Sequence, residues 1–277
     1  MAFMGDMMNP APFWQNGPAP GAFYNFPGNS SGFGPTTHPV QEFKAHGPYN
    51  VSASSLVEGM VIGVKFDKGC VLAADTLGSY GTLARFRDCP RITKVNDLIL
   101  LGNGGDYADY QYLKDIIEQK IIDEQCIGDG LLLKPRSLHC WLTRVLYNKR
   151  SKMDPLWSNY VVAGMQDGEP FLGAVDKLGT AYEDAAIATG LGAYMATPLI
   201  REAVSKGSLD EEGFWVWVVE GSEIRALVRK CMEVLFYRDA RAFQRYQLGV
   251  VTAAGVRIED LAELKHDWSL AHMIHMK

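Results

Sequence analysis

The chain has 277 residues, of which 47% are hydrophobic and 21% are charged, so most of it is expected to be globular with a large core. The net charge of −5 argues against a protein that binds nucleic acid through a basic surface. No apolar run reaches the roughly 18 residues that a membrane-spanning helix needs, so neither a nucleic-acid partner nor a membrane partner is expected.

The N-terminal residues 1–56 differ in composition from the rest. Eight of the thirteen prolines lie within the first 50 residues, where Lys44 is the only lysine or arginine. Such a stretch cannot bury enough surface to offset the entropy of ordering it, so it predicts a disordered tail or a removable propeptide.

The five cysteines are dispersed without C-x-x-C spacing, which indicates reduced residues of an intracellular protein.

The globular part, residues 57–277, alternates between short apolar runs joined by turn residues and longer segments with helical spacing. Two sheets face to face, each covered by a helical layer, give the simplest packing of this order, a four-layer α/β/β/α sandwich. The predicted elements in chain order are strands 61–66, 70–75, 91–95 and 98–102, helices over 106–125 and from Pro135, strands 160–165, 171–176 and 179–182, helices 193–205 and 223–239, and strands 247–252 and 256–258.

One segment, residues 213–222, breaks this pattern. It contains six consecutive β-prone apolar residues between two predicted helices, where a polar turn is expected. It is either an additional contact strand for a partner, or a tolerated insertion or reading-frame error; the second interpretation is favoured.

Five motifs are spread over the globular part: Val-Leu-Ala-Ala-Asp at 71–75, Leu-Gly-Ser-Tyr-Gly at 77–81, Gly-Asn-Gly-Gly-Asp at 102–106, Ala-Thr-Gly at 188–190 and Phe-Tyr-Arg-Asp-Ala at 236–240. No single motif is specific, but together they resemble the β subunits of the 20S proteasome, which have the fold of N-terminal-nucleophile hydrolases. The stretches 79–87 and 105–109 resemble a non-catalytic member of that family in particular.

Active members of that family use an N-terminal threonine, freed by self-cleavage, as the nucleophile, together with a lysine, an aspartate and an oxyanion-binding glycine. The resemblance assigns the nucleophile to Gly59, which has no side chain, and the lysine to Arg91, which stays protonated. Self-cleavage before Gly59 is therefore not expected, and trimming of the tail by neighbouring subunits near residues 50–52 is expected instead. The other roles fall on Asp75, Gly105, Leu191, Asp239 and Ala242.

These seven positions are expected to be degenerate remnants without a catalytic role, because four of the seven roles are lost. The nucleophile and the lysine are replaced by Gly59 and Arg91, and two supporting serines by Leu191 and Ala242. Asp75 and Arg91 are predicted to form a structural ion pair, and Gly105 to permit a tight turn. Asp239 is expected to pair with a neighbouring arginine or with another chain. No metal and no cofactor is expected, because the histidines lack ligand spacing and the glycine runs lack a full dinucleotide fingerprint.

The resemblance implies a non-catalytic structural subunit that supports ring assembly and ubiquitin-dependent proteolysis by the particle, in the cytoplasm and nucleus. Its implied partners are β subunits of the same and the opposite ring, the α ring and assembly chaperones. The C-terminal tail 266–277 is expected to contact the opposite ring through Trp268, Leu270, Met273 and Ile274. Two alternatives stay open: an active threonine-type hydrolase with an unrecognised nucleophile, and a free-standing α/β binding protein.

Overall fold

The computed structural model describes residues 59–205 and 221–269. The chain divides into two units, residues 1–50 and 51–277, and all described residues belong to the second. The predicted tail 1–56 and the apolar run of the 213–222 segment lie outside the described residues.

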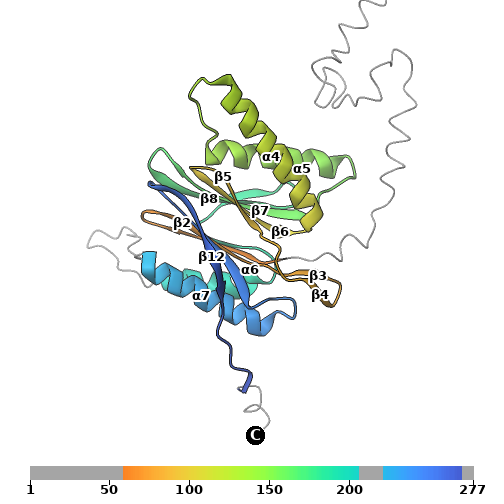
Figure 1. The fold of residues 1–277 in the computed structure, drawn as a ribbon, viewed down its shortest axis with the longest axis vertical. Helices are drawn as coiled ribbons and strands as arrows, with labels where there is room; N and C mark the ends of the chain where they lie inside the picture. The colour runs from red at the N-terminus through yellow and green to blue at the C-terminus, as the bar shows by residue number, and fades with distance from the viewer. Residues whose placement is uncertain (1–58, 206–220, 270–277) are drawn as a thin grey trace, which may run out of the picture. The chain divides into compact units, whose positions relative to one another are not determined.

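Two five-stranded antiparallel sheets and a separate two-stranded hairpin make up the β-structure (Figure 1). The first sheet has the order β10-β1-β2-β11-β12, the second has the order β5-β6-β7-β8-β9, and the hairpin joins β3 to β4. The strands are β1 Val61–Phe66, β2 Gly69–Asp75, β3 Gly78–Tyr80, β4 Leu83–Phe86, β5 Ile92–Asn96, β6 Ile99–Gly105, β7 Ser158–Gln166, β8 Glu169–Val175, β9 Ala181–Glu183, β10 Ala186–Ala188, β11 Arg245–Thr252 and β12 Gly255–Glu263.

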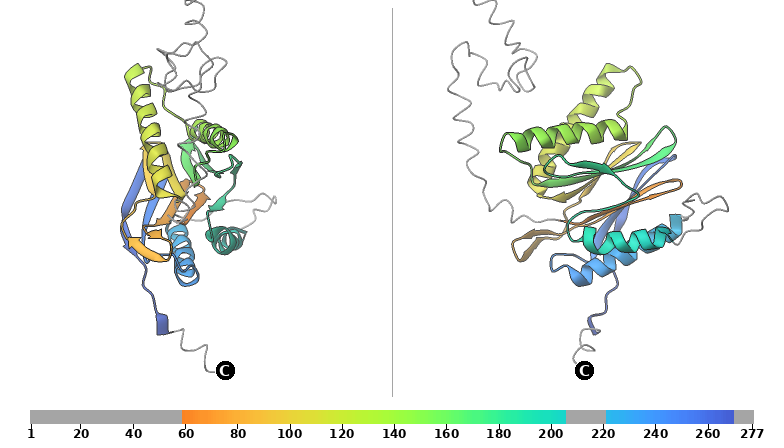
Figure 2. Two further views of the ribbon diagram at one scale, coloured as in Figure 1. Left: turned by 90° about the vertical axis from the view of Figure 1, so that its right-hand side faces the viewer. Right: turned by 180° about the vertical axis from the view of Figure 1, so that it is seen from behind.

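Two helical layers cover the outer faces of the sheets, as the views from the side and from behind show (Figure 2). The helices α4 (Tyr107–Ile127) and α5 (Pro135–Ser151) pack on the second sheet, and α6 (Gly192–Ser205) and α7 (Gly221–Arg238) pack on the first. The predicted four-layer α/β/β/α sandwich is therefore confirmed. None of the described helices is long and apolar enough to cross a membrane.

Among the described residues, three buried hydrophobic clusters fill the spaces between the layers. Strand β2 contributes side chains to two of them. Val71 and Ala73 belong to the cluster beneath α6 and α7, whereas Leu72 and Ala74 belong to the cluster between the sheets. This division follows from the pleat, because successive side chains of a strand point to opposite faces. The strand is buried on both faces and reads as an almost continuous apolar run.

Strand β6 ends directly before the N-terminus of α4, and only Asp106 lies between them. Asp106 is the N-cap of α4, and its Oδ1 accepts hydrogen bonds from the backbone N–H groups of Ala108 (2.8 Å) and Asp109 (3.2 Å). Gly128 ends α4 in the left-handed conformation, with φ of 67°.

The structure differs from the predicted elements at short strands and at strand ends; β12, for example, runs from Gly255 to Glu263, where only 256–258 was predicted. The hairpin β3–β4 and the strand β10 were not predicted. Strand β10 has only three residues and exists because it pairs with β1, where Ile62 faces Ala188 across the ladder. Strand β6 continues to Gly105 rather than ending at residue 102, since β7 pairs with it along its whole length.

Candidate functional site

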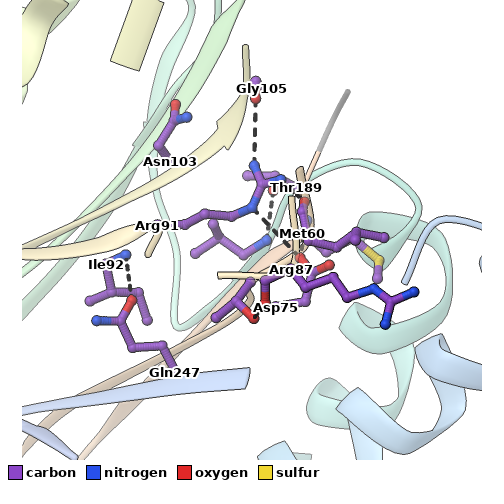
Figure 3. Close-up of polar contacts among 12 residues, drawn as sticks. Met60, Asp75, Arg87, Arg91, Ile92, Asn103, Gly105, Thr189 and Gln247 are labelled. Carbon is purple, nitrogen blue, oxygen red and sulfur yellow. Dashed lines mark hydrogen bonds and ion pairs between the residues drawn. The ribbon is translucent and has the colours of Figure 1, made fainter. Parts of the chain in front are cut away.

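Four of the positions that the sequence resemblance singled out lie together where β1, β2 and β6 meet the segment before β5 (Figure 3). Gly59 and Met60 lead into β1, Asp75 is the last residue of β2, Arg91 precedes β5, and Gly105 is the last residue of β6. The structure thus brings together four of the seven positions that the sequence singled out.

The backbone after Gly59 is held by two side chains. The Met60 N–H donates to Oδ1 of Asp75 (3.3 Å), and the Val61 N–H donates to Oγ1 of Thr189 (2.9 Å). Both bonds are buried, so they fix the position of Gly59 relative to β2 and β10.

Arg91 is a fully buried cation at the centre of the site, with 1% of its surface exposed. Its Nε lies 3.8 Å from Oδ1 of Asp75, which is the predicted structural ion pair. Its guanidinium also donates to the carbonyl oxygen of Leu77 and, at 3.5 Å, to that of Gly105. Arg91 therefore connects the ends of β2 and β6 through their backbone and through one carboxylate.

The guanidinium of Arg91 occupies the space that a side chain at position 59 would need. A Cβ atom built on Gly59 would overlap Cζ, Nη1 and Nε of Arg91, which are the three heavy atoms nearest to it. A residue with a side chain at position 59 thus requires Arg91 to move out of a buried position. Position 59 therefore carries no side-chain atom, and the space beside its Cα is already occupied.

Burial raises the pKa of Asp75 from its ordinary value of 3.8 to about 6, although the charge of Arg91 and the N–H of Met60 act in the opposite direction. Because the folded-state value lies above the unfolded one, protonated Asp75 stabilises the fold. This contribution is complete below about pH 4 and is lost as the pH rises through about 6.

We expect the Asp75→Asn variant to lack this pH dependence. Relative to the variant, the wild-type chain should lose about 2 kcal/mol of unfolding free energy between pH 4 and pH 7. Denaturant unfolding of both full-length chains at pH 4, 5, 6 and 7 measures the difference. A difference that is constant over this range would contradict the assigned pKa.

Gly105 serves a close approach of two backbones, and the predicted role in a tight turn is wrong. It lies at the end of β6, paired with Ser158 of β7, and its φ is not in the left-handed region. A Cβ on Gly105 would lie 2.7 Å from Cα of Ser158 and closer still to the carbonyl oxygen of Trp157. The next residue, Asp106, donates its N–H to that same carbonyl (2.8 Å). Only glycine fits this distance between the strands.

The other three sequence-predicted positions lie near α6 and α7. Leu191 and Ala242 are half-buried and pack against the apolar cluster beneath these helices. Asp239 follows α7, and its Oδ1 accepts the backbone N–H of Arg241 (2.9 Å). Its charge adds to the rise in the pKa of Asp75, behind burial, which is the largest cause. These residues have packing and turn-forming roles in the structure.

Thr189 has a part in the site that sequence reasoning did not assign. It exchanges two hydrogen bonds with Val61, one through its side chain and one through its backbone N–H (2.9 Å each). Its Oγ1 also lies where a Cβ on Gly104 would be. The motif Ala188-Thr189-Gly190 was visible in the sequence, but its partner in β1 is 128 residues away and carries no local signal.

Of the four residues predicted for the C-terminal tail, only Trp268 belongs to the described residues. Its ring packs against the rings of Tyr237 (centroids 5.1 Å apart) and Phe236 (5.8 Å), both in α7. The Asp267 N–H donates to Oη of Tyr237 (2.7 Å), and about half of Trp268 remains exposed. The start of the tail is therefore anchored on α7, and Leu270, Met273 and Ile274 lie outside the described residues.

Within the described ranges, no group of three or more His, Cys, Asp or Glu residues is placed to hold a metal ion. Among the described residues, the polar groups at the centre of the site are the ion pair of Asp75 and Arg91, the carbonyl oxygens of Leu77 and Gly105 and the hydroxyl of Thr189.

Comparison with known proteins assigns this architecture to a family. Residues 58–251 match the family model described as "Proteasome subunit". Two relatives named "Proteasome subunit beta type-4" cover almost the whole chain: the Xenopus laevis protein is 49% identical over 93% of this chain and 96% of its own, and the Drosophila melanogaster protein is 45% identical over 95% of both. The "Probable proteasome subunit beta type-7" of Schizosaccharomyces pombe is 37% identical over 86% of this chain and 89% of its own. The chain therefore belongs to the proteasome subunit family, as one of its β subunits.

Proposed function

We propose that this β subunit is non-catalytic and serves as a structural member of the proteasome ring. The observation that supports this most directly is the position of Arg91, whose guanidinium fills the space of a nucleophilic side chain at position 59. A permanently protonated guanidinium is also a poor replacement for the lysine of active members, because it does not exchange a proton near neutral pH.

The proposed partners are β subunits of the same and the opposite ring, subunits of the α ring and assembly chaperones. Family membership supports assembly of the chain with other proteasome subunits in general. The chain would support ubiquitin-dependent proteolysis by the particle, in the cytoplasm and nucleus, without cleaving peptides itself.

A threonine-directed electrophile, such as a peptide epoxyketone, tests the absence of catalysis. In the assembled particle we expect no label on the wild-type chain, since removing a nucleophile alone costs about 10⁶-fold in turnover in serine-protease systems. Labelled subunits of the same particle provide the positive control. Mass spectrometry of the separated chains reads the result, and a labelled residue in this chain would establish the alternative of an active hydrolase.

The Gly59→Thr variant makes the test sharper. It restores the hydroxyl but not the space for it, so we expect this chain to stay unlabelled while Arg91 is present. Overpacking against Arg91 should also cost about 1–3 kcal/mol of stability. Efficient labelling of the Gly59→Thr chain would show that Arg91 does not obstruct the site.

Membership of a large particle is tested separately by native mass. The tagged chain, isolated from its own cells, should migrate in a particle that contains several other α and β subunits. Migration near its own mass of 30.6 kDa would favour a free-standing binding protein.

A further inference from the structure

The β3–β4 hairpin extends to one side of the layered body, separate from both five-stranded sheets (Figures 1 and 2). All four residues of β4 are exposed, and the hairpin presents three large apolar side chains: Tyr80, Leu83 and Phe86, exposed by 49%, 59% and 47%. Gly78 and Ser79 of β3 are buried, so the exposed part of the hairpin is β4 together with Tyr80. A cluster of exposed apolar residues marks a surface that is covered in use.

The hairpin is nevertheless well organised. Its strands are joined by two residues, Gly81 and Thr82, between the paired Tyr80 and Leu83, and Gly81 has φ of 60°, which suits a tight hairpin turn. A preformed element binds with a smaller loss of conformational entropy than a flexible loop does.

The base of the hairpin is tied to the body by three hydrogen bonds. The carbonyl oxygen of Arg87 accepts from Oγ1 of Thr76 (3.1 Å) and from Nη2 of Arg245 (3.2 Å), and the Cys89 N–H donates to the carbonyl of Thr76 (2.9 Å). These contacts leave the apolar tip of the hairpin outside the body while holding its direction.

The charge of the hairpin is opposite to that of the chain. Arg85 and Arg87 are exposed, and the guanidinium of Arg85 lies over the ring of Phe86, 5.4 Å from its centroid. The chain as a whole carries −5. Arginine and aromatic residues are enriched at the centres of protein interfaces, and guanidinium groups select carboxylates.

We propose that the hairpin, residues 78–87, is a docking arm that binds a surface of an adjacent proteasome subunit in which carboxylates surround an apolar centre. The arm supplies the apolar contact through Tyr80, Leu83 and Phe86, and the orientation through Arg85 and Arg87. A ring is built from heterologous contacts, so the arm of one subunit meets a different surface on the next. This inference rests on the proposed ring membership.

Incorporation of the full-length tagged chain into the particle tests the arm. We expect Arg85→Glu/Arg87→Glu to reduce the incorporated fraction about tenfold relative to wild type, because like charges repel across such a contact. The double variant Arg144→Glu/Arg150→Glu, at two exposed arginines of α5, changes the net charge equally and should incorporate as wild type does. Equal incorporation of all three chains, or equal loss in both variants, would overturn the proposal. A wild-type chain that enters no particle would refute ring membership itself.

A photo-crosslinking residue at Leu83 identifies the surface that the arm contacts. The expected product is a crosslink to a different proteasome subunit, at a peptide containing Asp or Glu, that is lost in the Arg85→Glu/Arg87→Glu background. A crosslink to a second copy of this chain, or to no protein, would overturn the proposal. An unchanged unfolding temperature of the Arg85→Glu/Arg87→Glu chain shows that its lower incorporation and its lost crosslink reflect impaired docking and not misfolding.

Discussion

The Arg91→Met substitution is expected to lower the free energy of unfolding by about 3 kcal/mol at pH 7. It removes the partner of the buried Asp75 and the donor to the carbonyl groups of Leu77 and Gly105, while methionine retains much of the side-chain length. Breaking a buried pair on one side is costly because the remaining group stays away from water without compensation.

The cost should be smaller at pH 5 than at pH 7. The pKa of Asp75 is about 6, so at pH 5 this carboxyl is mostly protonated and needs no cationic partner. Denaturant unfolding of the full-length chain at both pH values measures the two costs. The matched control is Arg136→Met, which breaks an exposed pair with Glu183 (3.1 Å) and should cost less than about 1 kcal/mol. Equal costs for the two substitutions would show that Arg91 does not stabilise the site.

The Gly105→Ala substitution is expected to destabilise the chain by about 3 kcal/mol, the upper range for overpacking. The added methyl group would lie 2.7 Å from Cα of Ser158 and also overlap the carbonyl oxygen of Trp157. Both are backbone atoms at the start of β7, in its first residue and the residue before it, so relief requires β6 and β7 to separate at the point where they pair.

Gly128→Ala provides the matched control for this substitution. Gly128 has φ of 67° and no atom within 4 Å of a built Cβ, so alanine should cost only about 1 kcal/mol of backbone strain. The midpoints of urea unfolding compare the two variants. A Gly105→Ala chain as stable as Gly128→Ala would show that the strands at this position separate easily.

Much of the fold was predictable because its longer elements carry local signals. The apolar runs on both sides of Asp67-Lys68-Gly69 indicated the hairpin that became β1 and β2, and Pro135 marked the start of α5. Three short strands, β3, β4 and β10, were not predicted, because they show neither the length nor the alternation that identifies a strand. Their pairing partners supply the hydrogen bonds that define them.

The sequence by itself determined the absence of a side chain at position 59 and the presence of a carboxyl at position 75 and a guanidinium at position 91. Both are chemical properties of the residues, and they do not depend on distance. Only the tertiary structure decided that the guanidinium of Arg91 lies in the space of the absent side chain. It also decided that glycine is needed at position 105 because the backbone at the start of β7 lies close to it, and not because of a turn. The reason is that excluded volume is set by atoms that come together from β1, β2, β6 and β7, and no local pattern records where they meet.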